Sequence, residues 1–213
     1  MTHDQPDRPL KVVAINGSPR KDGNTRILLE AALAPMAQAG WATELLQVGG
    51  RPIHGCRACG QCMKRQDRQC SSGQDVFNGV FTRMLEADAI LLGSPTYFAD
   101  VSTEMKALID RAGFVAMANG CALAGKVGAA VVAVRRGGAT HAFDTMNHLF
   151  SISQMIVPGS TYWNIGYGLE PGAVSGDGEA LRNMRHLGEA MAWLGRAVAH
   201  SDAPYPVRRA GEA

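Results

Sequence analysis

The sequence lacks the features that mark membrane-spanning and exported proteins. No uninterrupted apolar stretch in its 213 residues approaches the roughly 20 residues of a membrane span. The first nine residues are polar and contain no apolar signal-peptide core. The formal net charge is only +2, so we expect no general attraction to nucleic acid or to an anionic membrane. These features predict a cytoplasmic protein.

The sequence also lacks internal repeats and low-complexity linkers. Hydrophobic residues make up 46% of the chain and charged residues 19%, as in ordinary soluble globular domains. A chain of this length can bury roughly 70% of its unfolded surface, so it needs no disulfide or metal in order to fold. We predict a single domain over residues 10–200, with tails at 1–9 and 201–213.

Short apolar runs alternate with helical patterns along this domain. The pattern predicts that Pro35 kinks or shortens the first helix, which begins at Asn24 or Thr25 and extends toward Gly40. Strands alternating with helices predict an α/β fold with a doubly wound parallel sheet, right-handed crossovers and helices on both faces. The predicted strands are 11–15, 42–48, 89–93, 127–134 and 160–167, and the later helices are 76–87, 103–118, about 141–156 and 179–200.

The loop after the first strand contains groups that suit a phosphate, and such sheets bind ligands at the carboxyl ends of their strands. Glycines allow the backbone to approach an anion, and the next helix offers free N–H groups. Ser18, Asn24 and Thr25 can donate hydrogen bonds, while Arg20 can supply charge. The loop lacks both the dinucleotide GxGxxG pattern and the glycine-lysine pattern of an ATP-binding loop. It suits a single terminal phosphate such as that of FMN; the alternative is an ordinary polar turn that caps the helix.

The loop after the third strand contains residues that suit a flavin ring. Such a ring needs a flat apolar wall and hydrogen-bond donors at its polar edge. Pro95, Tyr97 and Phe98 can form the wall, while Thr96 can meet the polar edge. The alternative is a loop whose aromatic residues simply pack into the core.

The fourth strand ends in two arginines and two glycines. Positive charge near the N1–C2=O region of a flavin would stabilise the anionic reduced ring. Arg135 or Arg136 could supply this charge, or could bind a phosphate of a nicotinamide nucleotide. The alternative is a solvated arginine pair. Arg135 and Gly137 are therefore candidate cofactor-binding residues.

Four of the five cysteines lie within a long loop at residues 49–73. A protein that is not exported keeps its thiols reduced, which favours metal or redox chemistry over disulfides. Cys56, Cys59 and Cys62 recur every three residues and can wrap one face of an iron–sulfur cubane, with Cys70 arriving from farther along. Structural zinc usually takes two separated pairs. Three interpretations of this loop therefore remain: a [4Fe–4S] cluster, a zinc site, or a loop without metal. Cys121 is expected to be a small buried hydrophobic residue.

Two of these segments resemble a known family. Residues 15–25, INGSPRKDGNT, closely resemble the phosphate loop of the NADPH-dependent FMN reductase and iron-sulfur flavoprotein group. Residues 93–111, GSPTYFADVSTEMKALIDR, look like the second signature of that group. The resemblance implies a flavodoxin-like sheet in the order 2-1-3-4-5, with FMN near the strand ends. Lys106, Asp110 and Arg111 also match the pattern and are expected to pair on the helix surface or at a subunit contact.

The resemblance also implies a function. It implies an oxidoreductase in which FMN accepts hydride from NAD(P)H and no side chain acts as acid or base. Electrons would pass to a small acceptor or a ferredoxin-like protein, with Cys56, Cys59, Cys62 and Cys70 holding a [4Fe–4S] cluster. A homodimer or homotetramer is implied as well. The alternatives are a quinone or nitro-compound reductase without iron, a non-catalytic electron carrier, and a degenerate fold whose cysteine loop binds zinc.

Overall fold

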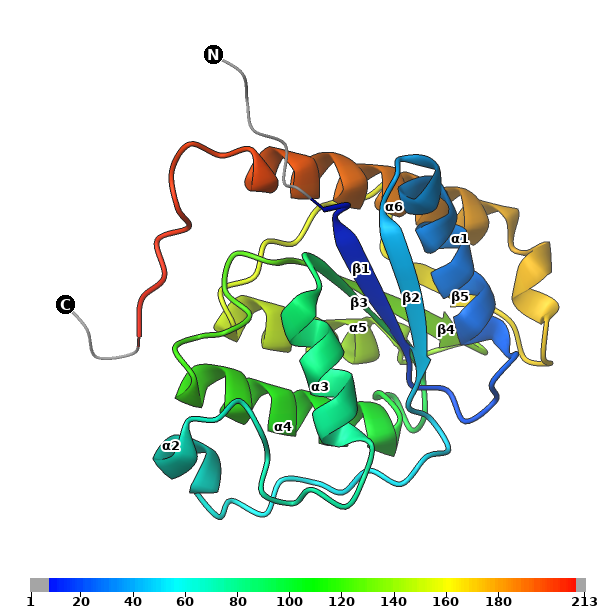
Figure 1. Ribbon diagram of the computed structural model, residues 1–213. Coiled ribbons are helices and arrows are strands. Elements are labelled where there is room, and N and C mark those ends of the chain that lie inside the picture. The colour runs from blue at the N-terminus through cyan, green and yellow to red at the C-terminus, as the bar shows by residue number, and fades with distance from the viewer. Residues whose placement is uncertain (1–7, 210–213) are drawn as a thin grey trace.

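The computed structural model describes residues 8–209, in which a sheet of five strands lies at the centre of the molecule (Figure 1). All neighbouring strands are parallel, and their order is β2-β1-β3-β4-β5. The order reverses between β1 and β3, which is where such sheets bind ligands. The predicted fold and strand order are therefore confirmed. The strands are β1 (Lys11–Asn16), β2 (Ala42–Gln47), β3 (Ala89–Pro95), β4 (Val127–Val134) and β5 (Ile165–Tyr167).

Helices cover both faces of the sheet (Figure 1). One face is covered by α1 and α6, and the other by α3, α4 and α5. Within residues 8–209, none of the helices has both the length and the apolar character needed to cross a membrane. The helices are α1 (Asn24–Gln38), α2 (Gln61–Arg65), α3 (Phe77–Glu86), α4 (Thr103–Ala118), α5 (Ala139–Ile152), the 3₁₀ turn η1 (Ala173–Gly176) and α6 (Gly178–Ala199).

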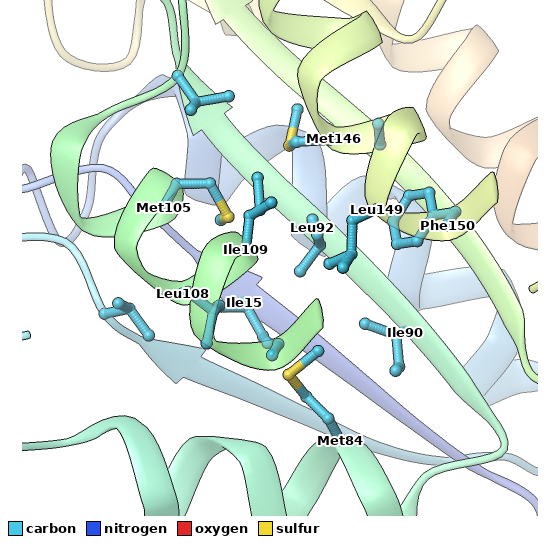
Figure 2. Packing of buried hydrophobic residues seen from close by; sticks show 14 of the residues in the cluster. Ile15, Met84, Ile90, Leu92, Met105, Leu108, Ile109, Met146, Leu149 and Phe150 are labelled. Carbon is cyan, nitrogen blue, oxygen red and sulfur yellow. The ribbon is translucent and has the colours of Figure 1, made fainter. Parts of the chain in front are cut away.

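The sheet separates two hydrophobic clusters, which explains why its inner strands are apolar without interruption. Along β1, Val13 and Ile15 face the cluster beneath α3, α4 and α5, whereas Val12 and Ala14 face the cluster beneath α1 and α6. Figure 2 shows the first cluster, where methionine, leucine and isoleucine side chains from the helices pack over the strands. Both clusters hold the carboxyl ends of β1, β3 and β4 in a fixed arrangement.

The fifth strand is much shorter than predicted. Only residues 165–167 pair with β4, and the predicted strand over 160–164 is wrong. Asn183 of α6 is buried and its side chain is hydrogen-bonded to the segment from Ser160 to Asn164. These hydrogen bonds replace sheet pairing, although the aromatic residues of this segment favour a strand.

Other boundaries differ in smaller ways. The residues 49–73, predicted to be a loop, contain the short helix α2. Helix α5 spans 139–152 rather than 141–156, because Gln154 adopts a left-handed conformation with φ of 57° and ends the helical path. Pro35 lies in the last turn of α1, which ends at residue 38.

The predicted tails lie partly outside the described residues, which exclude 1–7 and 210–213. Arg8 forms an ion pair with Asp88 at 2.8 Å. Residues 201–209 form no helix or strand, yet Arg208 is held by Gln154, whose amide donates to the Arg208 carbonyl and accepts its N–H.

Candidate functional site

The loop after β1 is held by two polar side chains from the ends of neighbouring strands. Asn16 is fully buried, and its side chain accepts the N–H of Ser18 at 3.0 Å and donates to Gln47 at 2.8 Å. Gln47, the last residue of β2, donates in turn to the carbonyls of Ser18 and Gly49 at 2.7 and 2.6 Å. The loop is therefore fixed in shape before any ligand arrives.

The start of α1 is open to a ligand. Its N-cap is Gly23, no side chain caps the helix, and its first turn contains no acidic residue. The N–H groups of this first turn therefore remain available for an anion. Ser18 and Thr25 lie buried at this end of the helix. A Cβ added at Gly49 would lie 2.2 Å from the carbonyl carbon of Ser18, so only glycine lets the loop after β2 pass this close.

The side chains of Asn24 and Arg20 contact the segment that follows β5. The Asn24 amide donates to the carbonyls of Gly168 and Glu170 at 3.1 and 3.0 Å and accepts the N–H of Val174 at 3.2 Å. Both hydrogens of this amide are therefore donated to the protein itself, whereas the sequence suggested a phosphate as their acceptor. Arg20 is exposed and donates to the carbonyl of Leu169 at 3.3 Å, which leaves most of its N–H groups free.

The loop after β3 turns back sharply on itself. Tyr97 and Asp100 exchange two backbone hydrogen bonds of 2.8 and 3.0 Å, and Phe98 and Ala99 between them have positive φ angles of 47° and 64°. This conformation is unfavourable for residues other than glycine and is often found at functional sites. Phe98 is fully exposed, whereas the hydroxyl of Thr96 is buried and has no hydrogen-bond partner among the described residues.

The loops after β3 and β4 lie against each other. Gly138 has a φ of 86°, and a Cβ added there would lie 2.7 Å from Cα of Ala99. Asp100 accepts a hydrogen bond of 2.7 Å from Thr145 of α5. Burial raises the pKa of Asp100, but the hydrogen bonds from Thr145 and from the N–H of Val101 lower the pKa more, so the carboxylate stays ionised.

The two arginines that follow β4 project from the surface. Arg135 and Arg136 are exposed, and neither has an ion pair within residues 8–209. Gly137 beside them is also exposed. The structure thus brings Arg135 and Gly137 to the same edge of the sheet as Ser18, Thr25 and the loop after β3.

All four clustered cysteines line one cavity of about 150 Å³. Two are exposed and two are half-buried, and all are free thiols: Cys56, Cys59, Cys62 and Cys70. Among residues 8–209, no three histidine, cysteine or acidic side chains are close enough to bind one metal ion. In a cubane each thiolate binds a different iron, so the thiols stand farther apart than around a single ion.

The thiol of Cys59 lies in a polar environment. It is 3.4 Å from the hydroxyl of Ser71. The hydrogen bond with Ser71, followed by one from the N–H of Gln61, lowers the pKa of this thiol. A thiolate is the form that binds iron.

The side chain of Arg111, in α4, binds both ends of the cysteine loop. The sequence did not predict this role. The Arg111 side chain is completely buried, so the expectation that it pairs on the helix surface is wrong. The guanidinium donates to Asp75 at 2.5 Å, to the carbonyl of His54 at 3.1 Å and to that of Ser72 at 2.8 Å. It also lies 4.1 Å over the ring of Phe77. One buried cation thus ties together both ends of the loop.

Lys106 and Asp110 do form the expected pair on the surface of α4, at 2.5 Å. Cys121 is only partly buried, and its thiol accepts a hydrogen bond of 3.4 Å from Gln154. It lies apart from the cavity of the other four cysteines.

Comparison with known protein families decides which family this chain belongs to. The pattern of the NADPH-dependent FMN reductases matches residues 10–170. This range includes the loops after β1, β3 and β4 and the four cysteines of the cavity. The chain belongs to this family. It is accordingly an FMN-dependent oxidoreductase, and the predicted resemblance is confirmed.

Relatives of similar length support this conclusion. An iron-sulfur flavoprotein of Methanocaldococcus jannaschii is 36% identical over 190 residues, which cover 86% of this chain and 96% of the relative. Two solved structures share the fold. One is RosB with a bound riboflavin-5'-phosphate derivative, with a TM-score of 0.71 at 18% identity over 91% of this chain and 82% of RosB. The other is a WrbA-like flavodoxin of Agrobacterium tumefaciens, with a TM-score of 0.62 at 17% identity. The match covers 89% of this chain and 99% of the flavodoxin.

Proposed function

We propose that this oxidoreductase takes hydride from NAD(P)H and passes electrons to a small acceptor or a redox protein, with FMN between the loops that follow β1, β3 and β4. The observation that carries the proposal is the uncapped first turn of α1. It begins beside a loop that Asn16 and Gln47 hold in shape. Free N–H groups at a helix start, together with the charge of Arg20, suit the terminal phosphate of FMN.

Each loop contributes a different part of the FMN site. The N–H groups of the first turn, with Ser18, Arg20 and Thr25, would hold the phosphate. The buried hydroxyl of Thr96 lacks a partner among the described residues, and a polar edge of the ring would satisfy it. Tyr97, Phe98 and Pro95 would provide the flat wall.

Arg135 would place positive charge beside the ring, where the reduced flavin carries negative charge. FMN, when bound, supplies two-electron acceptance of hydride and release of single electrons. The protein contributes the placement of the ring and the electrostatic field around it. No side-chain acid or base is needed for hydride transfer.

We also propose that the cysteine cavity holds a [4Fe–4S] cluster. Four thiols from Cys56, Cys59, Cys62 and Cys70 line one hollow, and Arg111 fixes both ends of the loop that supplies them. Such a cluster, when bound, supplies one-electron transfer. The relative from M. jannaschii is named an iron-sulfur flavoprotein, which supports this assignment.

The charge of the cysteine loop supports a protein partner. Residues 51–70 contain five arginines and lysines against a single aspartate, a net charge of +4 in a chain whose total is +2. A patch of this sign attracts an acidic ferredoxin-like protein. We propose such a carrier, or a small-molecule acceptor, as the partner of a cytoplasmic homodimer or homotetramer.

The FMN assignment is tested by removing one hydroxyl at a time. Thr25→Val and Ser18→Ala keep the size of each side chain nearly unchanged, and Thr43→Val, at an exposed position of β2, is the matched control. A hydrogen bond to a charged group contributes about 1.5–3 kcal/mol, so FMN should bind roughly 10- to 100-fold more weakly in each site variant. Titration of the apoprotein by quenching of flavin fluorescence measures this affinity. Unchanged affinity in both site variants would contradict the assignment.

The electron donor is tested separately on the FMN-loaded protein. Bleaching of the visible flavin absorbance under anaerobic NADPH or NADH would support hydride acceptance and identify the preferred nucleotide. No bleaching with either nucleotide, but rapid reduction by a reduced ferredoxin, would instead favour an electron carrier.

A further inference from the structure

A hollow of about 340 Å³ lies beside β5, and the proposed function does not use it. It is formed by the start of α5, the segment leading into β5 and the start of α6. Of the residues that the sequence suggested for cofactor or metal binding, Gly137 and Arg136 line it, and neither has a part in the proposed FMN site. Its volume falls within the range of about 300–1,000 Å³ that is typical of small-molecule sites.

The wall of this hollow carries three exposed aromatic rings. The exposed fractions are 63% for Tyr162, 54% for Trp163 and 53% for Tyr167. The rings of Tyr162 and Trp163 lie 4.9 Å apart and are tilted by 56°. Aromatic surface left in contact with water is unfavourable, and a cluster of it on a concave wall marks a place where flat apolar groups bind.

A buried amide holds the aromatic pair in position. Asn183 is 2% exposed; its oxygen accepts the N–H of Tyr162 at 3.1 Å, and its nitrogen donates to the carbonyls of Tyr162 and Trp163 at 3.2 and 3.0 Å. The same oxygen also accepts the hydroxyl of Thr161 at 2.8 Å. The backbone that presents the rings is therefore fixed without a ligand, which lowers the entropic cost of binding one.

The third ring is fixed by a carboxylate at the start of α6. Asp177 accepts the N–H of Tyr167 at 3.0 Å and, as the N-cap of α6, the N–H of Ala180 at 3.0 Å. Both polar side chains of this framework therefore act on the protein itself. Asp177 and the exposed Glu179 make this side of the hollow acidic, and the aromatic rings provide the apolar contact surface.

One side of the hollow supplies hydrogen-bond donors. Arg136 and Thr140 line it at the start of α5, and both are exposed. In the part of the chain that the structure describes, Arg136 forms no ion pair or hydrogen bond with another side chain. A guanidinium with free N–H groups pairs best with a planar oxygen acceptor.

We propose that this hollow binds a flat aromatic molecule bearing a carboxylate or carbonyl oxygen, stacked on Trp163 and Tyr162 with the oxygen on Arg136. The inference goes beyond the proposed function, because none of the residues assigned to the FMN site in that proposal lines this hollow.

The test uses 2-naphthoate, which has no redox activity, and isothermal titration calorimetry on the FMN-loaded protein. Decahydro-2-naphthoate, with the same skeleton and no aromatic ring, is the matched ligand. Trp163→Leu removes the stacking surface, and Trp193→Leu is the matched control on α6, since Trp193 is exposed and lines a different hollow. Arg136→Gln is compared with Arg185→Gln, an exposed arginine that does not line the hollow.

We expect 2-naphthoate to bind with a Kd of about 1 mM or tighter, a value reasonable for a ligand of this size. Trp163→Leu should weaken binding about tenfold and Arg136→Gln several-fold, whereas both controls should bind like the native protein. The saturated analogue should bind at least tenfold more weakly. These outcomes together would support the proposal.

Five results would overturn it, four of them in the binding measurements and one in sedimentation. The four binding results are no saturable binding up to about 5 mM, equal binding of the saturated analogue, unchanged affinity in Trp163→Leu, and binding to the apoprotein alone, which would mean that FMN fills the hollow. Sedimentation should show the same mass for native protein and Trp163→Leu; a dimer lost in the variant would show that a second copy covers the rings, against the proposal. Visible absorbance reports FMN separately, so a failure of the proposed function is recognised independently.

Discussion

The buried ion pair between Arg111 and Asp75 makes a strong prediction about stability. Both side chains are completely inaccessible, and the Nη1–Oδ2 distance is 2.5 Å. The same carboxylate accepts the N–H groups of His54 at 2.9 Å and Phe77 at 3.1 Å. Asp75→Asn removes the negative charge and places an NH₂ group against one of these donors. Removing one partner of a buried pair leaves an uncompensated charge and costs about 3–5 kcal/mol.

The matched control lies on the same helix. Lys106 and Asp110 form an ion pair of 2.5 Å, with side chains 48% and 39% exposed. Asp110→Asn should therefore cost no more than about 0.5–1 kcal/mol. Urea denaturation followed by circular dichroism measures both free energies of unfolding.

A double variant distinguishes the effect of an unpaired buried charge from the effect of any substitution in this region. Asp75→Asn combined with Arg111→Met removes both charges, and it should be more stable than Asp75→Asn alone because no buried charge is left unpaired. Hydrogen exchange should also show faster exchange over residues 54–75 in Asp75→Asn, since Arg111 then loses its anchor at one end of the loop. An Asp75→Asn variant no less stable than Asp110→Asn would refute this reasoning.

The same pair predicts a loss of stability in acid. Burial raises the pKa of Asp75, but the hydrogen bonds from Arg111, His54 and Phe77 outweigh it and bring the pKa below its ordinary value of 3.8. The stabilisation is therefore complete above about pH 5 and is lost as the pH falls below 3.8 toward the lower value of the folded protein. Urea titrations between pH 3 and 7 should show a smaller pH dependence in Asp75→Asn than in the native protein.

Three further changes test other parts of the structure. Phe98→Gly should raise the free energy of unfolding of the apoprotein by about 1 kcal/mol, because the residue has a positive φ and an exposed side chain, yet it should weaken FMN binding in a fluorescence titration. Cys62→Ser should reduce iron, measured by colorimetric analysis after anaerobic purification, from about four atoms per chain to nearly none with FMN unchanged, whereas Cys121→Ser should leave both unchanged. Asn24→Ala should destabilise the protein by about 2–3 kcal/mol in urea, because two carbonyls and one N–H lose their partners.

The fold could be predicted from the sequence because its local patterns agree with its tertiary structure. The run from Val127 to Val134 is apolar on both faces, and the structure buries both faces of β4. The glycines after β1 and β4 also indicated correctly where these strands end and the loops to the next helices begin. Each of these signals lies within a few neighbouring residues.

The features that were missed depend on partners distant in sequence. Arg111 has Asp110 beside it and Lys106 five residues before it, which resembles a surface pattern, and only the position of Asp75 explains its burial. Tyr162 and Trp163 favour a strand, but Asn183, about twenty residues later, holds them in a loop. The amide of Asn24 likewise binds a segment more than 140 residues away. No local pattern could indicate such contacts.

The most direct test of the central claim is the flavin content of the purified protein. Visible spectra, with FMN released by denaturation and quantified, should show about one FMN per chain, either as isolated or after incubation of the apoprotein with FMN. Binding should be weakened by Thr25→Val. A protein that stays colourless and shows no saturable FMN binding at micromolar concentration would contradict the account.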